Sequence, residues 1–306
     1  MNPTEVDLRS ILARDRPVLL DGAVGTELSR RGVPTTLPLW SAHAFVSRGW
    51  LSVLQGIHED YVGAGAEILV TNTFRTTRRA LEKAGRAADW RGFNTLAVAC
   101  ARDAASTAPG PCLVAGGIAP LEDCYSPHLV PPESDCLAEH ARQVELLADL
   151  GVDLIFIETM NSAGEARAAV VASRECGLDM LLSLCPKAPS HLLSGEGLED
   201  IVPQLVDAGG ARLQGILLNC AAPEVLEIVF PRFLTLAPEL PHGLYTHLGE
   251  SDDVTGWKLP ERHEPERYAN WMARRLEEGA RLVGGCCGTT PDHIAALNRA
   301  IARPAQ

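Results

Sequence analysis

Eight short apolar runs, rich in valine, isoleucine and leucine, recur along the chain. Their apolar residues are continuous rather than alternating with polar ones, which is typical of strands buried on both faces of a parallel sheet. The pattern predicts strands over residues 17–22, 67–72, 112–117, 153–158, 180–185, 215–220, 243–248 and 281–286.

Segments of helical periodicity separate these runs. Proline occupies the expected first turn of several of them, for example at Pro223 and Pro291, where its missing amide hydrogen costs the helix nothing. The predicted helices cover residues 51–64, 137–150, 163–175, 223–233 and 265–278, and a last one begins at Thr290-Pro291-Asp292.

This alternation over 306 residues predicts an α/β fold, namely a closed (β/α)8 barrel of the TIM type that forms one domain over residues 1–306. An open, doubly wound sheet is the alternative. The first strand-to-helix turn, Gly22-Ala23-Val24-Gly25, lacks the G-x-G-x-x-G spacing of dinucleotide-binding open sheets, which favours the barrel.

A barrel also indicates where a site would lie, because barrel enzymes carry their chemistry at the carboxyl ends of the strands. Polar and thiol side chains gather at those ends, where a purely structural strand would simply stop. They are Asp21-Gly22, Asn72-Thr73, Glu158-Thr159, Cys185, Asn219-Cys220, His247 and the segment from Gly284 to Cys287.

The composition narrows the class of protein. The chain is 46% hydrophobic, enough for a large core, and its formal net charge is −12 without any basic run, so we expect neither nucleic-acid nor membrane binding. No apolar run reaches the ~18–20 residues of a membrane span. The first ten residues lack the apolar core of a signal peptide, so the expected compartment is the cytoplasm.

The chain has nine cysteines, an odd number without an export signal, so no disulfide framework is expected. Cys286 and Cys287 are adjacent within the glycine-rich segment VGGCCGT, and adjacent cysteines rarely bond to each other. They are either two thiols packed under a turn or two ligands of one soft metal ion. In the second case Gly284, Gly285 and Gly288 let the backbone curl so that both sulfurs converge.

A metal site would need a third thiolate, and Cys220 ends another predicted strand. Three sulfurs with an open fourth position describe a catalytic zinc site, whereas a structural zinc has four protein ligands.

Glu158 ends an otherwise apolar strand, where an isolated carboxylate is costly unless it meets a cation or hydrogen-bond donors. It either caps the next helix, pairs with a core arginine, or binds a substrate ammonium group. Asp21 belongs either to an ordinary tight turn or to a ligand site, with Gly22 and Gly25 permitting close backbone approach to a ligand.

Other polar residues are assigned ordinary roles. His58-Glu59 lacks the second histidine of H-E-x-x-H, so we interpret it as an exposed helical pair. The arginine-rich residues 73–86 are interpreted as a solvated helix face. The remaining histidines without ligand spacing, predicted to lie at the surface, are His43, His128, His191 and His242.

Seven stretches, in family order from Val18 to Leu297, resemble the homocysteine S-methyltransferases. They read LLDGAVGTELSRRG, PLWSAHAF, ILVTNTFRTT, VAGGIAP, FIETMNSAGEA, GILLNC and LVGGCCGTTPDHI. The separated cysteines, one after LLN and two in GGCC, are the most specific feature. The resemblance implies a (β/α)8 barrel with one zinc ion, held by Cys220, Cys286 and Cys287.

The resemblance also implies a substrate site. Glu158 and the Asp21-Gly22 turn would bind the amino and carboxylate ends of homocysteine. Asn72-Thr73 would line the floor of the site. Trp40 would face the methyl donor.

The chain departs from the family at two positions. Thr159 follows Glu158 where betaine-specific members carry tyrosine, which weakens a betaine assignment. His247 stands where many relatives have asparagine. His247 is therefore a candidate resting fourth zinc ligand, to be replaced by substrate sulfur, and a surface-loop histidine is the alternative.

The predicted activity is that of a homocysteine S-methyltransferase: zinc-dependent methyl transfer from an onium donor to the thiolate of homocysteine, forming methionine. S-Methylmethionine is the favoured donor, followed by S-adenosylmethionine and then by betaine or dimethylsulfoniopropionate; no corrinoid donor is expected. An onium charge favours an aromatic wall, for which Trp40 is the first candidate and Trp257 the second.

Two alternatives stay open. The acceptor could be selenohomocysteine or another small thiol or selenol. The protein could also be a non-catalytic, zinc-stabilised thiol-binding protein.

Overall fold

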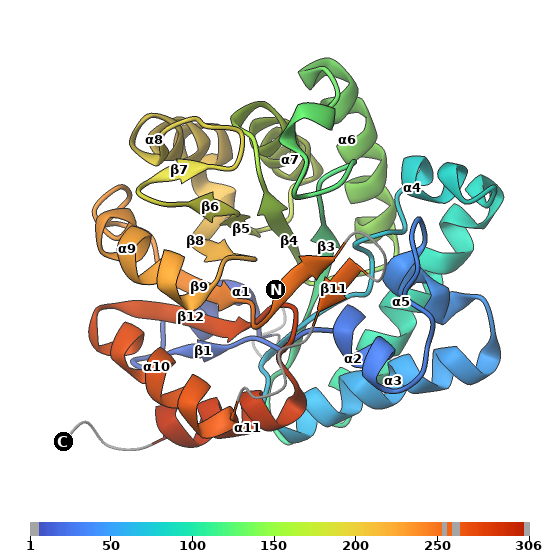
Figure 1. Ribbon diagram of the computed structural model, residues 1–306, viewed down its shortest axis with the longest axis horizontal. Coiled ribbons are helices and arrows are strands. Elements are labelled where there is room, and N and C mark those ends of the chain that lie inside the picture. Colours follow the sequence, from blue (N-terminus) through green and yellow to red (C-terminus); the bar gives the residue numbers. More distant parts are fainter. Residues whose placement is uncertain (1–5, 253–255, 259–263, 303–306) are drawn as a thin grey trace.

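Eight parallel strands form a barrel, and helices surround them (Figure 1). The computed structural model describes residues 6–252, 256–258 and 264–302. Neighbours around the sheet follow the order β1-β12-β9-β8-β5-β4-β3-β2, and a parallel bridge between Leu20 and Ile68 joins the two edge strands. The strands are β1 (Val18–Leu19), β2 (Ile68–Val70), β3 (Leu113–Ile118), β4 (Leu154–Met160), β5 (Met180–Leu184), β8 (Leu213–Asn219), β9 (His242–Thr246) and β12 (Ala280–Gly285).

These strands coincide with the eight apolar runs, so the prediction of a (β/α)8 barrel is confirmed. The reason is burial on both faces. In β3, β4 and β5 every residue is buried, because one face of each strand points into the barrel and the other packs under the helices.

The predicted helices are also present, with shifted ends. α3 begins three residues earlier than the periodicity indicates, because the Ser47 hydroxyl accepts a hydrogen bond from the Trp50 amide (3.3 Å) and caps the helix. The helices are α1 (Leu8–Leu12), α2 (Gly25–Arg30), α3 (Arg48–Gly63), α4 (Arg78–Lys83), α5 (Trp90–Ala105), α6 (Glu133–Asp149), α7 (Ala163–Cys176), α8 (Leu198–Gly209), α9 (Pro223–Phe233), α10 (Pro265–Glu277) and α11 (Pro291–Ile301).

The apolar core has two layers. The outer layer lies between strands and helices, for example at Leu54 of α3 and Phe230 of α9. The inner layer fills the barrel from Leu8 of α1 to Tyr245 and Cys286 at the carboxyl ends of the strands. The phenol of Tyr245 and the thiol of Cys286 therefore lie at the carboxyl-terminal end of the apolar layer that fills the barrel, which keeps them out of contact with water.

Two short hairpins extend the loops at the carboxyl ends of β5 and β9. They consist of β6 (Pro186–Lys187) with β7 (His191–Leu192), and β10 (Glu250–Asp252) with β11 (Gly256–Lys258). The hydropathy pattern does not indicate them, because such short antiparallel pairs need no apolar face. The longest helix among the described residues, α6, has 17 residues, and none of the described helices combines the length and apolarity of a membrane span.

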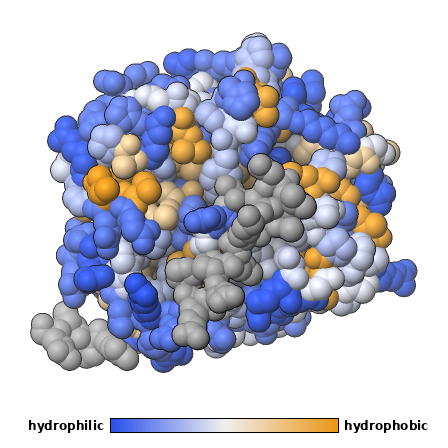
Figure 2. All heavy atoms as spheres, viewed as in Figure 1, coloured by the Kyte–Doolittle hydropathy of each residue, from blue (hydrophilic) through white to orange (hydrophobic). Residues whose placement is uncertain are grey.

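Exposed apolar groups are few on the face shown in Figure 2, where hydrophobic side chains form small separate patches among hydrophilic ones. Leu37 and Leu129 are about half exposed, at 49% and 48%. Both line the cavity described below, so their exposure marks its mouth.

Two histidine predictions are wrong. His58 is fully buried on the inner side of α3, where desolvation lowers its pKa to about 4. His242 is also buried; it begins β9 and packs edge-on against Phe233, with ring centroids 5.3 Å apart. A histidine in a helical or strand pattern lies on the side that packing dictates, and its polarity alone does not place it at the surface.

Candidate functional site

One cavity of about 480 Å³ opens at the carboxyl ends of the strands. Its wall brings together most of the residues that the sequence singles out, although they are separated by up to 265 positions (22 to 287). Those that line it are Gly22, Trp40, Asn72, Glu158, Cys220, Cys286 and Cys287. Asp21, Thr73 and His247 are not among the lining residues and lie behind the wall.

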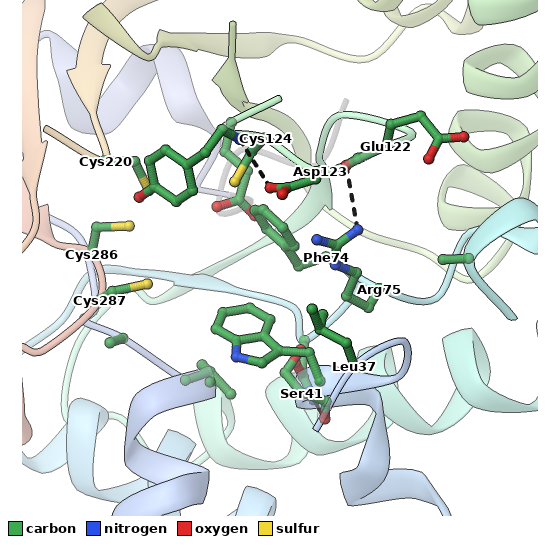
Figure 3. A pocket seen from close by; sticks show the side chains of 18 of the residues that line it. Leu37, Ser41, Phe74, Arg75, Glu122, Asp123, Cys124, Cys220, Cys286 and Cys287 are labelled. Atoms are coloured by element: carbon green, nitrogen blue, oxygen red, sulfur yellow. Dashed lines mark hydrogen bonds between the residues drawn. The ribbon is translucent and has the colours of Figure 1, made fainter. Parts of the chain in front are cut away.

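Three thiols converge in this cavity from two strand ends. Cys220 follows β8, Cys286 and Cys287 follow β12, and the three side chains project into the same space (Figure 3). The neighbouring Cys286 thiol and burial raise the pKa of Cys220 well above its usual range, so this thiol is protonated in the absence of a cation.

The backbone of the GGCCGT turn is fixed by the neighbouring strand ends. The Cys286 amide donates to the Thr246 carbonyl (2.8 Å), and the Leu248 amide donates to the Cys287 carbonyl (2.7 Å). Thr289 links the turn to the first strand, because its hydroxyl donates to the Cys286 carbonyl (2.8 Å) and accepts from the Ala23 amide (3.1 Å). These bonds fix the backbone of the turn, and with it the positions from which the two thiols project.

Gly288 is required for this turn. Its φ is +85°, and a Cβ there would lie 1.9 Å from the Leu248 carbonyl oxygen. Only glycine tolerates both the left-handed conformation and the contact.

The donor set suits zinc, since three soft sulfurs with space for a fourth ligand are the composition of catalytic zinc sites. Within the part of the chain that the structure describes, no group of three His, Cys, Asp or Glu side chains already has the arrangement of an assembled metal site. The pKa of each of the three thiols is raised well above its usual range by the neighbouring thiols and by burial. Metal binding would therefore require their deprotonation and a small adjustment of the side chains.

Glu158 reaches the cavity because it lies on the inward-facing side of β4. Leu154 and Phe156, four and two positions before it, belong to the layer that fills the barrel. Side chains alternate between the two faces of a strand, so the carboxylate of Glu158 also points inward and lines the cavity. Burial, with the nearby charge of Asp21 as a second cause, raises the pKa of Glu158 to about 8. The structure gives it no cation partner among the described residues, so it is a desolvated acid suited to an ammonium ligand.

Asp21 stands behind the wall as a structural acid. Its carboxylate accepts from the Tyr245 hydroxyl (2.7 Å) and from the Val70 amide (2.8 Å), bonds that tie β1 to β9 and β2. Burial still raises its pKa to about 7, against the opposing effect of these bonds. Asp21 thus contributes negative potential next to Glu158 and positions Tyr245, which lines the cavity.

Three non-glycine residues of the site have positive φ: Trp40 (45°), Thr159 (62°) and Cys220 (48°). This conformation is uncommon outside glycine and costs of order 1–3 kcal/mol per residue. For the β-branched Thr159 it is an outlier. Among the described residues no other non-glycine residue has it, so backbone strain is concentrated at this site.

An aromatic wall faces the cavity. Trp40 and Phe74 meet edge to face, with centroids 5.5 Å apart. Gly25 makes room for the indole, because a Cβ there would lie 2.5 Å from the Trp40 ring. Glycines 22 and 25 thus serve close packing, Gly22 against Tyr61 and Gly25 against Trp40. The side chain of Trp257, the second aromatic candidate, lies outside the described residues.

Asn72 and Thr73 are held in different ways. The Asn72 amide donates to the Ser41 carbonyl (3.0 Å), whereas the Thr73 hydroxyl donates to the Gly117 carbonyl (2.8 Å). Asn72 lines the cavity and Thr73 anchors the end of β3.

His247 lies next to the cysteine cluster. Its backbone amide donates to the Ala221 carbonyl (3.3 Å), and its imidazole lies against the backbone of Cys220. Desolvation lowers the pKa of the imidazole to about 4.

The lining residues that sequence reasoning did not single out include Phe74, Arg75, Tyr125 and Tyr245. Residues 73–86 do not form one solvated helix face, because α4 begins only at Arg78 and the preceding loop turns Phe74 and Arg75 toward the cavity. The sequence feature that could have identified Phe74 and Arg75 is their position directly after Asn72-Thr73, at the end of a predicted strand. Tyr245 was placed within a strand, but its face was not determined.

A (β/α)8 barrel with desolvated acid and thiol groups at the carboxyl ends of its strands is the architecture of an enzyme. A family model described as homocysteine S-methyltransferase matches residues 18–301, and the chain belongs to this family of methyltransferases. The homocysteine S-methyltransferase of Escherichia coli (strain K12) is 31% identical over 95% of this chain and 97% of its own length.

Two further similarities are informative. The selenocysteine methyltransferase of Astragalus bisulcatus is 27% identical, over 91% of this chain and 90% of its own. A crystal structure of the homocysteine methyltransferase MmuM from Escherichia coli, in a metallated form, superposes with a TM-score of 0.82 at 29% identity, covering 95% of this chain and 99% of that chain.

Proposed function

We propose that this enzyme transfers a methyl group from an onium donor to the thiolate of homocysteine, with one zinc ion held by Cys220, Cys286 and Cys287. The observation that carries the proposal is the convergence of three thiols, one buried acid and an aromatic wall on a single cavity. The metallated form of a relative that is 29% identical supports a metal at such a site.

Zinc bound by three cysteines would lower the pKa of a substrate thiol in its open position and so provide a thiolate at neutral pH. Without it, a free thiol with a pKa near 8.5 is mostly protonated and a poor nucleophile. His247 stays a candidate for the resting fourth ligand, since its imidazole lies against Cys220.

The protein's own residues position the reactants. Glu158 would accept a hydrogen bond from the homocysteine ammonium group, and the turn at Asp21-Gly22 would face its carboxylate. The acceptor sulfur would then point toward the cysteine cluster. Trp40 and Phe74 would hold the onium methyl group on the other side, by cation–π attraction of ~0.5–2 kcal/mol.

The transfer balances without a general base. The methyl carbon bonds to the sulfur of homocysteine, using a thiolate electron pair, while the bond to the donor sulfur or nitrogen breaks and its electron pair leaves with the neutral donor product. The thiol proton is released to solvent earlier, when the thiolate forms. Catalysis then consists mainly of holding thiolate and methyl group in line.

S-Methylmethionine is our first choice of donor, S-adenosylmethionine the second, and betaine or dimethylsulfoniopropionate the third. Thr159 stands where a betaine-specific enzyme would have tyrosine, and Trp40 belongs to the LWSA segment. A selenol is an alternative acceptor, which the likeness to a selenocysteine methyltransferase supports.

The test is a rate comparison with the purified, zinc-loaded enzyme. Homocysteine is fixed, each donor is varied, and initial rates of methionine formation are measured, followed by the same series with selenohomocysteine. We expect the highest kcat/KM with S-methylmethionine. Faster turnover with betaine than with either sulfonium would overturn the ranking, and no transfer from any onium donor would overturn the mechanism.

A further inference from the structure

Arg75 lies in the loop between β2 and α4 and lines the same cavity as the three thiols. Figure 3 shows its guanidinium beside Phe74, on the opposite side of the cavity from Cys286 and Cys287. One terminal nitrogen donates to the Glu122 carbonyl (3.3 Å), and the guanidinium carbon lies 5.6 Å from the centroid of the Phe74 ring. These two contacts fix the plane of the group.

Among the described residues, no acid forms an ion pair that balances the charge of Arg75. Its Nε is buried and has no hydrogen-bond partner. The nearby acids are engaged elsewhere: the Glu122 carboxylate pairs with Arg79 and Lys83, and the Asp123 carboxylate accepts from the Tyr125 amide (3.0 Å) and the Ser126 hydroxyl (3.2 Å). No carboxylate of the described residues forms an ion pair with Arg75.

A partly buried guanidinium with free donors has lost hydration without gaining a counter-charge, and it matches a carboxylate in a two-bond fork. Lys83 also lines the cavity, but Glu122 already neutralises it. Arg75 is therefore the unpaired cation of the described cavity wall, and it stands on the same side as the aromatic wall.

We infer that Arg75 binds the carboxylate of the methyl donor, and that the donor class is restricted to onium compounds with a free carboxylate at one end. This inference rests on the proposed function and adds a donor subsite to it. Trp40 and Phe74 would hold the onium centre while Arg75 holds the opposite end. The acceptor carboxylate would remain at the Asp21-Gly22 turn, far from this guanidinium in sequence and on another strand end.

The experiment compares S-methylmethionine with its carboxamide, which keeps the sulfonium and the shape but lacks the negative charge. For the wild type we expect kcat/KM to favour the acid about ten- to hundredfold, the usual worth of a charge-assisted hydrogen bond. In Arg75→Met the KM for the acid should rise by that factor, with kcat little changed, and the acid-to-amide ratio should approach one. Arg75→Lys should fall between them.

Arg78→Met is the matched control. Arg78 is three residues further on, at the exposed start of α4, and does not line this cavity. For the Arg78→Met variant, the ratio of kcat/KM for the acid to kcat/KM for the carboxamide should equal that of the wild type. Thermal melting of each variant checks folding, and if Arg75→Met does not fold, Arg75→Gln replaces it.

The outcomes separate the two proposals. An unchanged acid-to-amide ratio in the Arg75 variants, or a rise in the KM for homocysteine instead of the donor, overturns the role of Arg75 while leaving methyl transfer intact. Absence of transfer from every onium donor overturns the proposed function. In that case, calorimetric titration of wild type and Arg75→Met with S-methylmethionine still tests the subsite, and equal affinity or no binding by the wild type overturns it.

Discussion

Asn219 and Thr159 exchange two hydrogen bonds across the carboxyl ends of β8 and β4. The Thr159 amide donates to Asn219 Oδ1 (3.1 Å), and Asn219 Nδ2 donates to the Thr159 hydroxyl (2.8 Å). That hydroxyl in turn donates to the sulfur of Cys220 (3.6 Å). The pair therefore holds Thr159 at its strained positive φ and connects the acid at position 158 with the cysteine cluster.

We expect Asn219→Ala to remove this restraint. Both residues are fully buried, so the variant leaves polar groups of Thr159 unsatisfied, at a cost of about 1–3 kcal/mol in the free energy of unfolding. Relaxation of Thr159 should also move Glu158 and lower homocysteine affinity. Urea unfolding and calorimetry measure the two effects.

Asn94→Ala is the control for this pair. Asn94 is equally buried, in α5, and its Oδ1 accepts from the Thr76 hydroxyl (2.7 Å), away from the cavity wall. It should lose similar stability and keep its homocysteine affinity. If both variants weaken homocysteine binding equally, the Asn219–Thr159 pair has no special role at the site.

Glu158→Gln tests recognition of the ammonium group. Loss of a desolvated, charge-assisted hydrogen bond typically costs ~1.5–3 kcal/mol, so the Kd for homocysteine should rise roughly ten- to hundredfold while metal content stays constant. Glu67→Gln is a matched control, because Glu67 is a buried acid just before β2, at the opposite end of the barrel, where it pairs with Arg14 and Arg16. Intact affinity in Glu158→Gln, or an emptied metal site, would remove the assigned role.

The raised pKa of Glu158, about 8 in the fold, gives a pH dependence with a defined sign. Between its ordinary pKa near 4.5 and about 8, the folded state binds more protons than the unfolded chain. The free energy of unfolding therefore falls as pH rises through this range, by up to about 1.4 kcal/mol per pH unit from this group, and levels off above it. Asp21, with a pKa of about 7, acts in the same direction.

The measurement compares the melting temperatures of wild type and Glu158→Gln from pH 5 to pH 8. Glutamine does not titrate, so the stability advantage of the variant should grow with rising pH. Bound homocysteine should reduce this stability difference, because its ammonium group stabilises the ionised carboxylate of Glu158 in the wild type. If the difference in melting temperature between wild type and Glu158→Gln does not change with pH, the raised pKa of Glu158 is contradicted.

Each of Cys220→Ser, Cys286→Ser and Cys287→Ser should lose most of its zinc, because two thiolates do not complete the donor set. Cys185→Ser is the closest control: Cys185 is buried beside the cluster, and its thiol donates to the Cys220 carbonyl (3.5 Å). It should keep its metal. Full zinc retention in Cys220→Ser would exclude that residue, and retention in His247→Ala would exclude His247 as a necessary ligand.

Gly25→Ala should act on the donor through Trp40, since a methyl group at this position would collide with the indole. We expect a KM for the donor that is severalfold higher, with the KM for homocysteine little changed. Gly49→Ala in α3 is the control, because a Cβ there meets nothing within 4 Å. Kinetics with both substrates varied distinguish the effects, and an increase confined to homocysteine would place Trp40 on the acceptor side.

The hydropathy pattern along the chain predicts the barrel and the end of it that carries the candidate site. Strands buried on both faces are continuous apolar runs, so their number, order and ends could be predicted, and with them the polar residues at the carboxyl ends. Cys220, Cys286, Cys287 and Glu158 were identifiable because thiols and an acid at the ends of apolar strands need a partner.

The direction in which each side chain faces could be read only from the folded chain. Glu158 shares the inward-facing side of β4 with Leu154 and Phe156, Asp21 is bonded to Tyr245 behind the cavity wall, and the loop before α4 turns Phe74 and Arg75 into the cavity. His58 was misplaced for the same reason. These orientations depend on contacts between segments far apart in the chain, such as Thr159 with Asn219, and hydropathy along a single segment carries no information about them.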